Sequence, residues 1–131
     1  MKKEDNNEKV VYPKLSYRIV GILYKVWDEI GWSHKEEYIQ KAVAIALRKE
    51  EIPFKEQVKV ELNFQDEKVG EYYLDFLINN RVVLELKRSN HFSKHDIEQI
   101  LAYLKTSGHK LGILAHFTRE GVRAKRILNT Y

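Results

Sequence analysis

Residues 71–88 read EYYLDFLINNRVVLELKR, two apolar stretches separated by a pair of asparagines. Both stretches are rich in Val, Leu, Ile, Tyr and Phe, which favour β-strands, and the asparagines favour a turn. The sequence therefore predicts a buried hairpin. Three charged residues, Asp75, Glu85 and Lys87, lie where such a hairpin is expected to be apolar. Burying a carboxylate is costly unless it is paired or binds a metal ion, so these residues are candidates for chemistry.

The length of the turn decides whether the two carboxylates meet. A two-residue turn, Asn79-Asn80, would put Asp75 and Glu85 on different faces of the hairpin, because a slip of one residue reverses every side chain. A three-residue turn that includes Arg81 sets the carboxylates directly opposite each other. Such a turn needs a residue at positive φ, which asparagine tolerates. The Cβ atoms would then lie about 5 Å apart, close enough for both side chains to bind one Mg²⁺ or Mn²⁺ ion.

The composition fits one globular domain without a membrane span. The chain has 131 residues, of which 44% are hydrophobic and 32% charged, and it carries a net charge of +4. No apolar run approaches the roughly 18 residues that a membrane span requires. The chain contains no cysteine, which excludes disulfides, thiolate zinc sites and iron–sulfur clusters and favours the cytoplasm. The positive charge is compatible with an anionic partner.

Apolar spacing and end signals predict the remaining elements. Residues 1–13 are polar and charged, and we expect them to form a flexible lead-in to a single domain at 14–131. The expected helices cover 15–30, 33–50 and 93–107. A half-exposed strand is expected at 57–64 and a buried strand at 110–117, and the basic tail is expected to form a short helix or an edge strand. The last predicted helix connects two strands that we expect to be parallel.

Glu36 has two interpretations. Ser33 and Glu36 match a capping box, in which each side chain satisfies a main-chain N–H group of the other residue. Glu36 also shares a helix face with Ile39 and Val43, so it lies on the stripe that is expected to be buried. A carboxylate there would be placed to act as a third metal ligand. The sequence alone leaves both roles open.

Two motifs resemble a known superfamily. Asp75 followed by Glu85-Leu86-Lys87 resembles the D…(D/E)xK signature of the PD-(D/E)XK nuclease superfamily, with Leu74 in place of the proline. Residues 30–47, IGWSHKEEYIQKAVAIAL, resemble the motif of the GxxExxY protein family, a group of short bacterial and archaeal chains within that superfamily. The resemblance extends over about residues 15–129.

The GxxExxY motif is matched in part. Its three fixed positions fall on Ser33, Glu36 and Ile39, of which only Glu36 is identical, although Tyr38 adjoins the position of the motif tyrosine. The missing tyrosine puts any role of that hydroxyl in doubt, whereas the residues that correspond to metal ligands are all present.

The resemblance implies an α/β fold with a restriction-endonuclease-like core, in which helices flank a mixed sheet of about four strands. It implies metal-dependent hydrolysis of phosphodiester bonds in nucleic acid, with DNA favoured over RNA. Asp75, Glu85 and the Leu86 carbonyl would hold Mg²⁺ or Mn²⁺, with Glu36 as a further or water-bridged ligand. Lys87 would orient the attacking water or stabilise charge on the phosphate.

Further residues are candidates for contact with substrate. Gln99 and Tyr103 are four apart on a helix and resemble the Q-x-x-x-Y pair of RecB-like nucleases; otherwise they are two polar groups at the edge of the surface. Arg88 and His91 lie in the polar loop after Lys87, and His34 adjoins the Glu36 motif. The cations of the tail, Arg119, Arg123, Lys125 and Arg126, are either solvated or in contact with phosphate.

Two other classes of function remain open. The same fold could serve as an inactive module that binds nucleic acid or protein, since Ser33 and Ile39 depart from the motif. Asp75, Glu85 and Lys87 could also form a purely structural cluster of buried ions. The superfamily commonly forms homodimers, but the sequence contains no signal for an interface.

Overall fold

The structure is a computed structural model that describes residues 11–131. Most of the predicted lead-in, residues 1–10, lies outside the described residues. Val11 and Tyr12 pack against the hydrophobic core, and Pro13 is the first residue of a helix. The elements are α2 (Pro13–Ile30), α3 (Glu36–Lys49), β1 (Phe54–Phe64), β2 (Glu67–Ile78), β3 (Val82–Lys87), α4 (Lys94–Ser107), β4 (Leu111–Thr118) and β5 (Gly121–Leu128).

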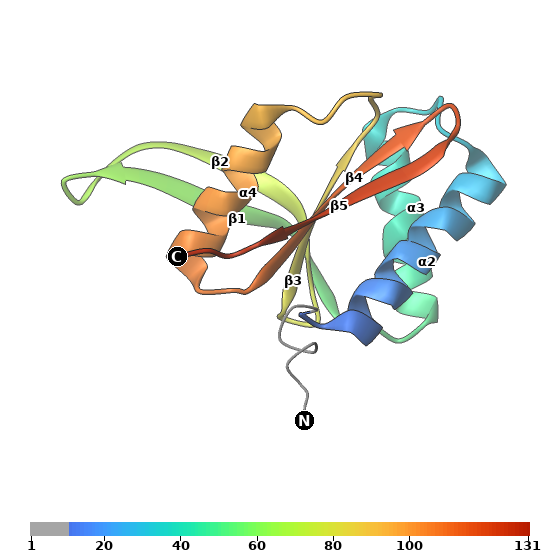
Figure 1. Cartoon of the computed structure of the whole chain (residues 1–131), viewed down its shortest axis with the longest axis horizontal. Coiled ribbons are helices and arrows are strands. Elements are labelled where there is room, and N and C mark those ends of the chain that lie inside the picture. The colour runs from blue at the N-terminus through green and yellow to red at the C-terminus, as the bar shows by residue number, and fades with distance from the viewer. Residues whose placement is uncertain (1–10) are drawn as a thin grey trace.

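The five strands form one mixed sheet in the order β1-β2-β3-β4-β5 (Figure 1). Strands β3 and β4 are parallel, as predicted, and α4 connects them, whereas the other three neighbouring pairs are antiparallel. The prediction of about four strands was one strand short. The basic tail is the fifth, because residues 121–128 pair with β4 along its whole length and form an edge of the sheet.

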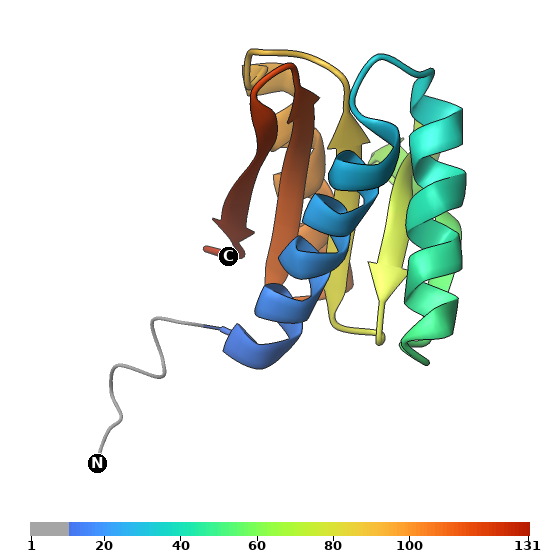
Figure 2. The same ribbon diagram turned by 90° about the vertical axis from the view of Figure 1, so that its right-hand side faces the viewer.

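Helices cover both faces of the sheet. Helices α2 and α3 lie side by side on one face, and α4 lies on the other (Figure 2). The first core cluster packs the buried stripes of α2 and α3, including Leu23 and Leu47, against the sheet. The second core cluster packs α4, including Ile100 and Leu104, against the opposite face. A Cβ on Gly112 of β4 would collide with Ile100, so glycine permits the close approach of α4.

Strand β2 changes the face that its side chains present at Asp75. Phe76 and Ile78 belong to the first core cluster, whereas Leu74 and Tyr72 pack in the second. A regular strand would keep these four even-numbered residues on one face. The irregularity at Asp75 therefore rotates the rest of β2 relative to the sheet.

Strand β1 shows the same change beside it. Phe54 packs on the first core cluster and Val60 belongs to the second, and between them Gln57 adopts a φ of 53°. The positive φ is unfavourable for a residue with a Cβ, and it bends the strand. The far end of the β1–β2 hairpin consequently extends from the body of the domain (Figure 1).

Strand β3 keeps a regular alternation. Leu84 and Leu86 point into the first core cluster, and Val83 points into the second, on the side of α4. Glu85 and Lys87 alternate with those leucines and therefore face α4. No helix within residues 11–131 is long and apolar enough to cross a membrane.

Candidate active site

The turn between β2 and β3 has the predicted length. Ile78 pairs with Val82, so three residues, Asn79, Asn80 and Arg81, form the loop. Both asparagines have a φ of 53°, which their short polar side chains tolerate. This turn sets the register that places Asp75 opposite Glu85.

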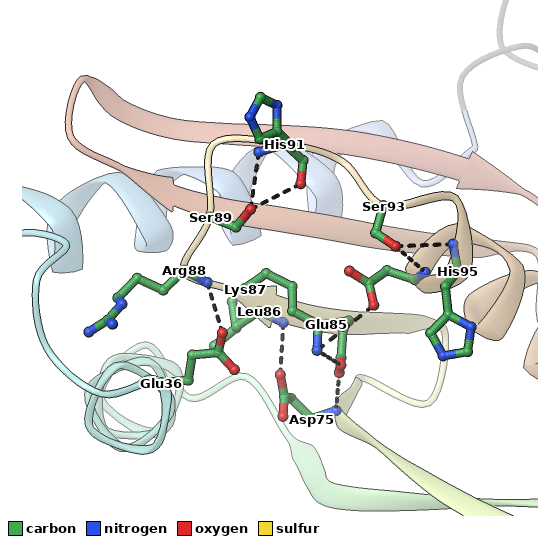
Figure 3. Close-up of polar contacts among 11 residues, drawn as sticks. Glu36, Asp75, Glu85, Leu86, Lys87, Arg88, Ser89, His91, Ser93 and His95 are labelled. Carbon is green, nitrogen blue, oxygen red and sulfur yellow. Dashed lines mark hydrogen bonds and ion pairs between the residues drawn. The ribbon is translucent and has the colours of Figure 1, made fainter.

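The regular pairing of β2 with β3 stops one residue before the two carboxylates. The last regular pair is Phe76 with Leu84. Beyond it, the Asp75 N–H donates to Glu85 Oε1 at 3.0 Å, and the Leu86 N–H donates to Asp75 Oδ2 at 2.7 Å (Figure 3). The two carboxylates therefore lie between the strands and accept the hydrogen bonds that carbonyl groups accept in a regular sheet. The prediction that they meet is confirmed.

Burial makes ionisation of this pair unfavourable. The Glu85 side chain is 8% exposed. Burial, followed by the neighbouring charge of Asp75, raises the pKa of Glu85 well above its ordinary value of 4.5. Burial likewise raises the pKa of Asp75. Two buried acidic groups in contact form a site where a bound cation would be strongly favoured, because the cation would offset both the repulsion and the desolvation.

Lys87 is held beside the pair. Its ammonium group lies 3.4 Å from Glu85 Oε2 and 3.9 Å from Asp96 Oδ1. Burial lowers the pKa of Lys87, but the attraction of Glu85, Asp96 and Glu36 outweighs burial, and the pKa is raised overall. Lys87 is therefore a fixed cation at the end of β3.

The role of Asp96 was missed in the sequence. The Ser93 hydroxyl caps α4 by accepting from the N–H groups of His95 and Asp96. The Asp96 carboxylate is the second partner of Lys87. The available signal was an acidic residue in the first turn of the helix that follows the motif lysine.

The predicted capping box of α3 is wrong. The helix begins at Glu36, its N-cap is Lys35, and no side chain caps it, because Ser33 comes two residues too early. The Glu36 carboxylate instead accepts from the N–H of Arg88 at 2.9 Å, at the end of β3 (Figure 3). Glu36 is therefore attached to the strand that carries Glu85 and Lys87, and it contributes to the negative potential at Asp75.

The donor set suits a hard cation. Asp75 and Glu85 offer carboxylate oxygens, and the Leu86 carbonyl is the main-chain ligand that the resemblance implies. Within residues 11–131, no three His, Cys, Asp or Glu side chains converge closely enough to form a metal site. Asp75 and Glu85 therefore lie together, whereas the Glu36 carboxylate bonds to the main chain at the end of β3, and its role as a further or water-bridged ligand stays a prediction.

The Arg88 side chain contacts His34, but only at the main-chain carbonyl of His34. One guanidinium nitrogen of Arg88 donates to the carbonyls of Ser33 and His34, at 3.2 and 3.0 Å. Arg88 thus joins the end of β3 to the loop before α3. His91 bonds to Ser89 through its own main chain, and its ring points away from the carboxylates (Figure 3).

Tyr103 lies away from the carboxylates, and the hydrogen bond of Gln99 is made by its main chain, so a role of this pair at the site stays a prediction. Tyr103 belongs to the second core cluster, and its hydroxyl lies 3.1 Å from His109 Nδ1. The carbonyl of Gln99 accepts from the hydroxyl of Tyr72 at 2.7 Å. Tyr103 lies seven residues beyond Asp96, which is about 10 Å along a helix. The Gln99 carbonyl therefore links α4 to β2, and the Tyr103 hydroxyl links α4 to His109, just beyond the helix.

His116 is the second residue that the sequence analysis missed. It is 1% exposed at the end of β4, and its Nδ1 lies 3.0 Å from the carbonyl of Ser89. Its ring packs on Phe92 with the ring centroids 4.3 Å apart, and burial lowers its pKa. The signal was available, because a polar residue in the apolar stretch KLGILAHF meets the same criterion that identified Asp75.

Comparisons with known proteins agree with this architecture. A solved structure, the crystal structure of SSO0001, shares 19% sequence identity with a TM-score of 0.55; the likeness covers 100% of this chain and 71% of SSO0001 and concerns the fold. A search of curated proteins found no match. A family model described as the PD-(D/E)XK nuclease superfamily matches residues 13–127, a range that includes Glu36, Asp75, Glu85 and Lys87. With its mixed sheet between helices and its paired carboxylates, the chain belongs to the PD-(D/E)XK nuclease superfamily.

Proposed function

We propose that the protein is a nuclease that uses Mg²⁺ or Mn²⁺ to hydrolyse phosphodiester bonds in nucleic acid, with DNA favoured over RNA. The observation that carries the proposal is the pair Asp75 and Glu85, buried between two separated strands with the ammonium group of Lys87 3.4 Å from Glu85. Membership of a nuclease superfamily supports the same class of reaction.

The chemistry divides among the residues as follows. A bound divalent ion would polarise the phosphate and lower the pKa of a bound water. Asp75, Glu85 and the Leu86 carbonyl would hold that ion, and Glu36 would serve as a further or water-bridged ligand. Lys87 stabilises negative charge on the phosphate oxygens or orients the attacking water, and Asp96 keeps the ammonium group charged and in place.

Within the superfamily, we assign the chain to the GxxExxY proteins on the basis of Glu36. Its position at the first turn of α3, within hydrogen-bonding distance of the end of β3, gives this glutamate a role at the site. At the position of the motif tyrosine, Ile39 is 1% exposed and belongs to the first core cluster. Tyr38 is 48% exposed and does not replace that tyrosine in the core.

An inactive interaction module is the second candidate. Two observations favour it: the carboxylates of Asp75 and Glu85 are already satisfied by main-chain N–H groups, and Ile39 takes the place of the motif tyrosine. Such a module would bind nucleic acid or protein on the same fold without cutting.

The deciding experiment tests cleavage and metal binding together. The protein is incubated with single-stranded, double-stranded and branched DNA and RNA in Mg²⁺, Mn²⁺ or EDTA, and Mn²⁺ binding is measured by calorimetry. We expect cleavage with metal only, and loss of both cleavage and Mn²⁺ binding in Asp75→Asn. The matched control is Asp66→Asn in the β1–β2 turn, where φ is 66° and asparagine is tolerated.

The possible results separate the candidates. Salt-sensitive binding to nucleic acid without cleavage under any metal would support the inactive module. Absence of cleavage, of Mn²⁺ binding and of nucleic-acid binding would overturn the nuclease proposal and leave the structural ion cluster.

A further inference from the structure

The sheet face that carries Lys87 continues across two more strands. Lys87 of β3 lies beside His116 of β4, which in turn lies beside Arg123 of β5. Two residues before Lys87 on β3, Glu85 lies beside Leu114 of β4, which lies beside Lys125 of β5. Paired neighbours project from the same face, so Arg123 and Lys125 share the α4 face with Lys87 and Glu85. We call Lys87, Arg123 and Lys125 the basic row.

Phe92 keeps the outer two cations of the basic row together. The Arg123 guanidinium and the Lys125 ammonium lie 5.6 and 5.9 Å from the centroid of its ring, within the range of cation–π contact. The ring of His116 packs against Phe92 as well. Phe92, in the loop that follows Lys87, thus contacts both cations and holds them close to each other.

The two outer cations retain capacity for an anion. One nitrogen of Arg123 donates to the carbonyl of Asn90 at 3.3 Å, which leaves the other donors of the guanidinium available. Both side chains are exposed, and neither forms an ion pair with a carboxylate among residues 11–131. Two adjacent cations without an acidic partner are suited to a phosphate group.

The distance of Arg123 and Lys125 from the carboxylates indicates which phosphate of the nucleic acid they would contact. Neighbouring strands lie about 4.8 Å apart, so Arg123 and Lys125 begin about 10 Å from Lys87 and Glu85. Phosphates of one strand wind around the helix axis as well as rising about 3.4 Å along it, so neighbouring phosphates are farther apart in space than this rise, and the distance of about 10 Å spans about two nucleotides. The long side chains of Arg and Lys extend the reach of the site by one phosphate in either direction.

We propose that Arg123 and Lys125 form a second phosphate-binding site, which holds a backbone phosphate about two nucleotides from the scissile bond and so lays the substrate strand across β3, β4 and β5. The inference rests on the proposed nuclease function and adds to it the path of the nucleic acid. Because both contacts are to phosphate, this site strengthens binding without reading the base sequence.

The first measurement needs no cleavage. Affinity for a fluorescent oligonucleotide is measured in EDTA over a range of salt concentrations, for the wild type and for Arg123→Gln/Lys125→Gln. We expect the affinity of the variant to fall about tenfold, and the slope of log affinity against log salt to become shallower by about 1 to 2. Thermal melting checks that the variant is folded.

Two further double variants serve as controls for Arg123→Gln/Lys125→Gln. Lys49→Gln/Arg126→Gln removes the same charge from α3 and from the other face of β5, and we expect it to change the slope by less than half as much. Arg123→Lys/Lys125→Arg keeps both charges and is expected to retain most of the affinity. Equal effects of the two charge-removing pairs would overturn the second site, because they would show a general effect of net charge.

The second measurement finds the phosphate. Oligonucleotides with one neutral methylphosphonate linkage are cut in Mn²⁺, and cleavage is quantified at every bond, which fixes the register. We expect the wild type to lose several-fold in rate at the bond about two nucleotides from the neutral linkage, and Arg123→Gln/Lys125→Gln to be insensitive to it. A variant as sensitive as the wild type would contradict the proposal.

Failure of the inference is distinct from failure of the proposed function. Cleavage with an unchanged salt slope and unchanged methylphosphonate sensitivity would reject the second site and leave the nuclease intact. If the salt slope of Arg123→Gln/Lys125→Gln is shallower but the wild type cuts nothing, the second phosphate site is supported and the nuclease function is rejected. A wild type that neither binds nor cuts would reject both.

Discussion

The two halves of the β2–β3 hairpin are built differently. In the half next to the turn, Phe76, Leu77 and Ile78 pair in register with β3 in a regular ladder of buried side chains. In the other half, the carboxylates of Asp75 and Glu85 replace the ladder and bond to main-chain N–H groups. A carbonyl in a ladder has no alternative partner, whereas a carboxylate can accept from an N–H group and also bind a cation. The first half therefore holds the fold, and the second half is able to exchange ligands.

The largest effect on stability is expected in the ladder half. Leu84 is completely buried in the first core cluster. Leu84→Ala removes its apolar contacts and leaves a cavity, so we expect the free energy of unfolding to fall by about 2–5 kcal/mol. Chemical denaturation with and without Mn²⁺ measures the loss, which should be the same in both. A loss below about 1 kcal/mol would contradict the division between the halves.

The next largest effect concerns Lys87 in the other half. Lys87→Ala is expected to lower the rate of cleavage by about 10²–10³-fold, the usual cost of removing one preorganised electrostatic group. Mn²⁺ binding should be retained or become tighter, since a cation beside two carboxylates is removed. Single-turnover cleavage and calorimetry measure the two quantities.

The same variant tests the structural ion cluster. If Lys87 serves only to neutralise Glu85 and Asp75, its loss leaves buried charge uncompensated and should lower the free energy of unfolding by about 3–5 kcal/mol. Melting that falls strongly in Lys87→Ala without any response to Mn²⁺, together with a wild type that cuts nothing, would decide for the cluster.

A smaller effect is expected from pH. Because burial raises the pKa of Glu85 above its ordinary value of 4.5, the folded protein without metal binds more protons than the unfolded chain above that pH. The free energy of unfolding should therefore decrease as the pH rises from about 4.5 through the raised pKa. Mn²⁺ should reduce this decrease, and Glu85→Gln should remove most of it. Denaturation in EDTA and in Mn²⁺ across this range tests the sign.

The smallest effect on stability is expected at Glu36. Glu36→Gln retains an oxygen that accepts from the N–H of Arg88, so we expect the free energy of unfolding to change by less than about 1 kcal/mol. Mn²⁺ affinity should fall by about tenfold if Glu36 holds a metal-bound water, which is typical of residues that support a ligand. An unchanged Mn²⁺ titration would show that Glu36 serves only to attach α3 to β3.

The local signals of the sequence were sufficient for the hairpin. Two asparagines that tolerate positive φ fix the three-residue turn, and the turn fixes the register of Asp75 with Glu85. Gly31 and Gly108 likewise follow the ends of α2 and α4, each with a positive φ that glycine adopts readily. In each of these cases a few neighbouring residues determine the conformation.

The features that the sequence did not predict involve contacts between segments that are distant in the chain. Ser33 and Glu36 form a plausible cap on their own, but Glu36 bonds to Arg88, which is 52 residues away. The change of face at Asp75 depends on packing against both helical layers, which no alternation pattern contains. Tyr103 has the spacing of a site residue, yet its hydroxyl contacts His109. The sequence thus supplies the candidates, and the tertiary structure selects among them.

The bond between Glu36 and Arg88 also bears on the order of folding. The contact between Asp75 and Leu86 closes a loop of 11 residues, and such a local hairpin is able to form early. The contact between Glu36 and Arg88 joins segments 52 apart and requires that α3 has docked on the sheet. Contacts of large sequence separation are generally slow to form, because closing the loop costs entropy before the contacts that stabilise it have formed. The amide of Arg88 is therefore a reporter of the completed fold, and its hydrogen exchange follows the docking of α3.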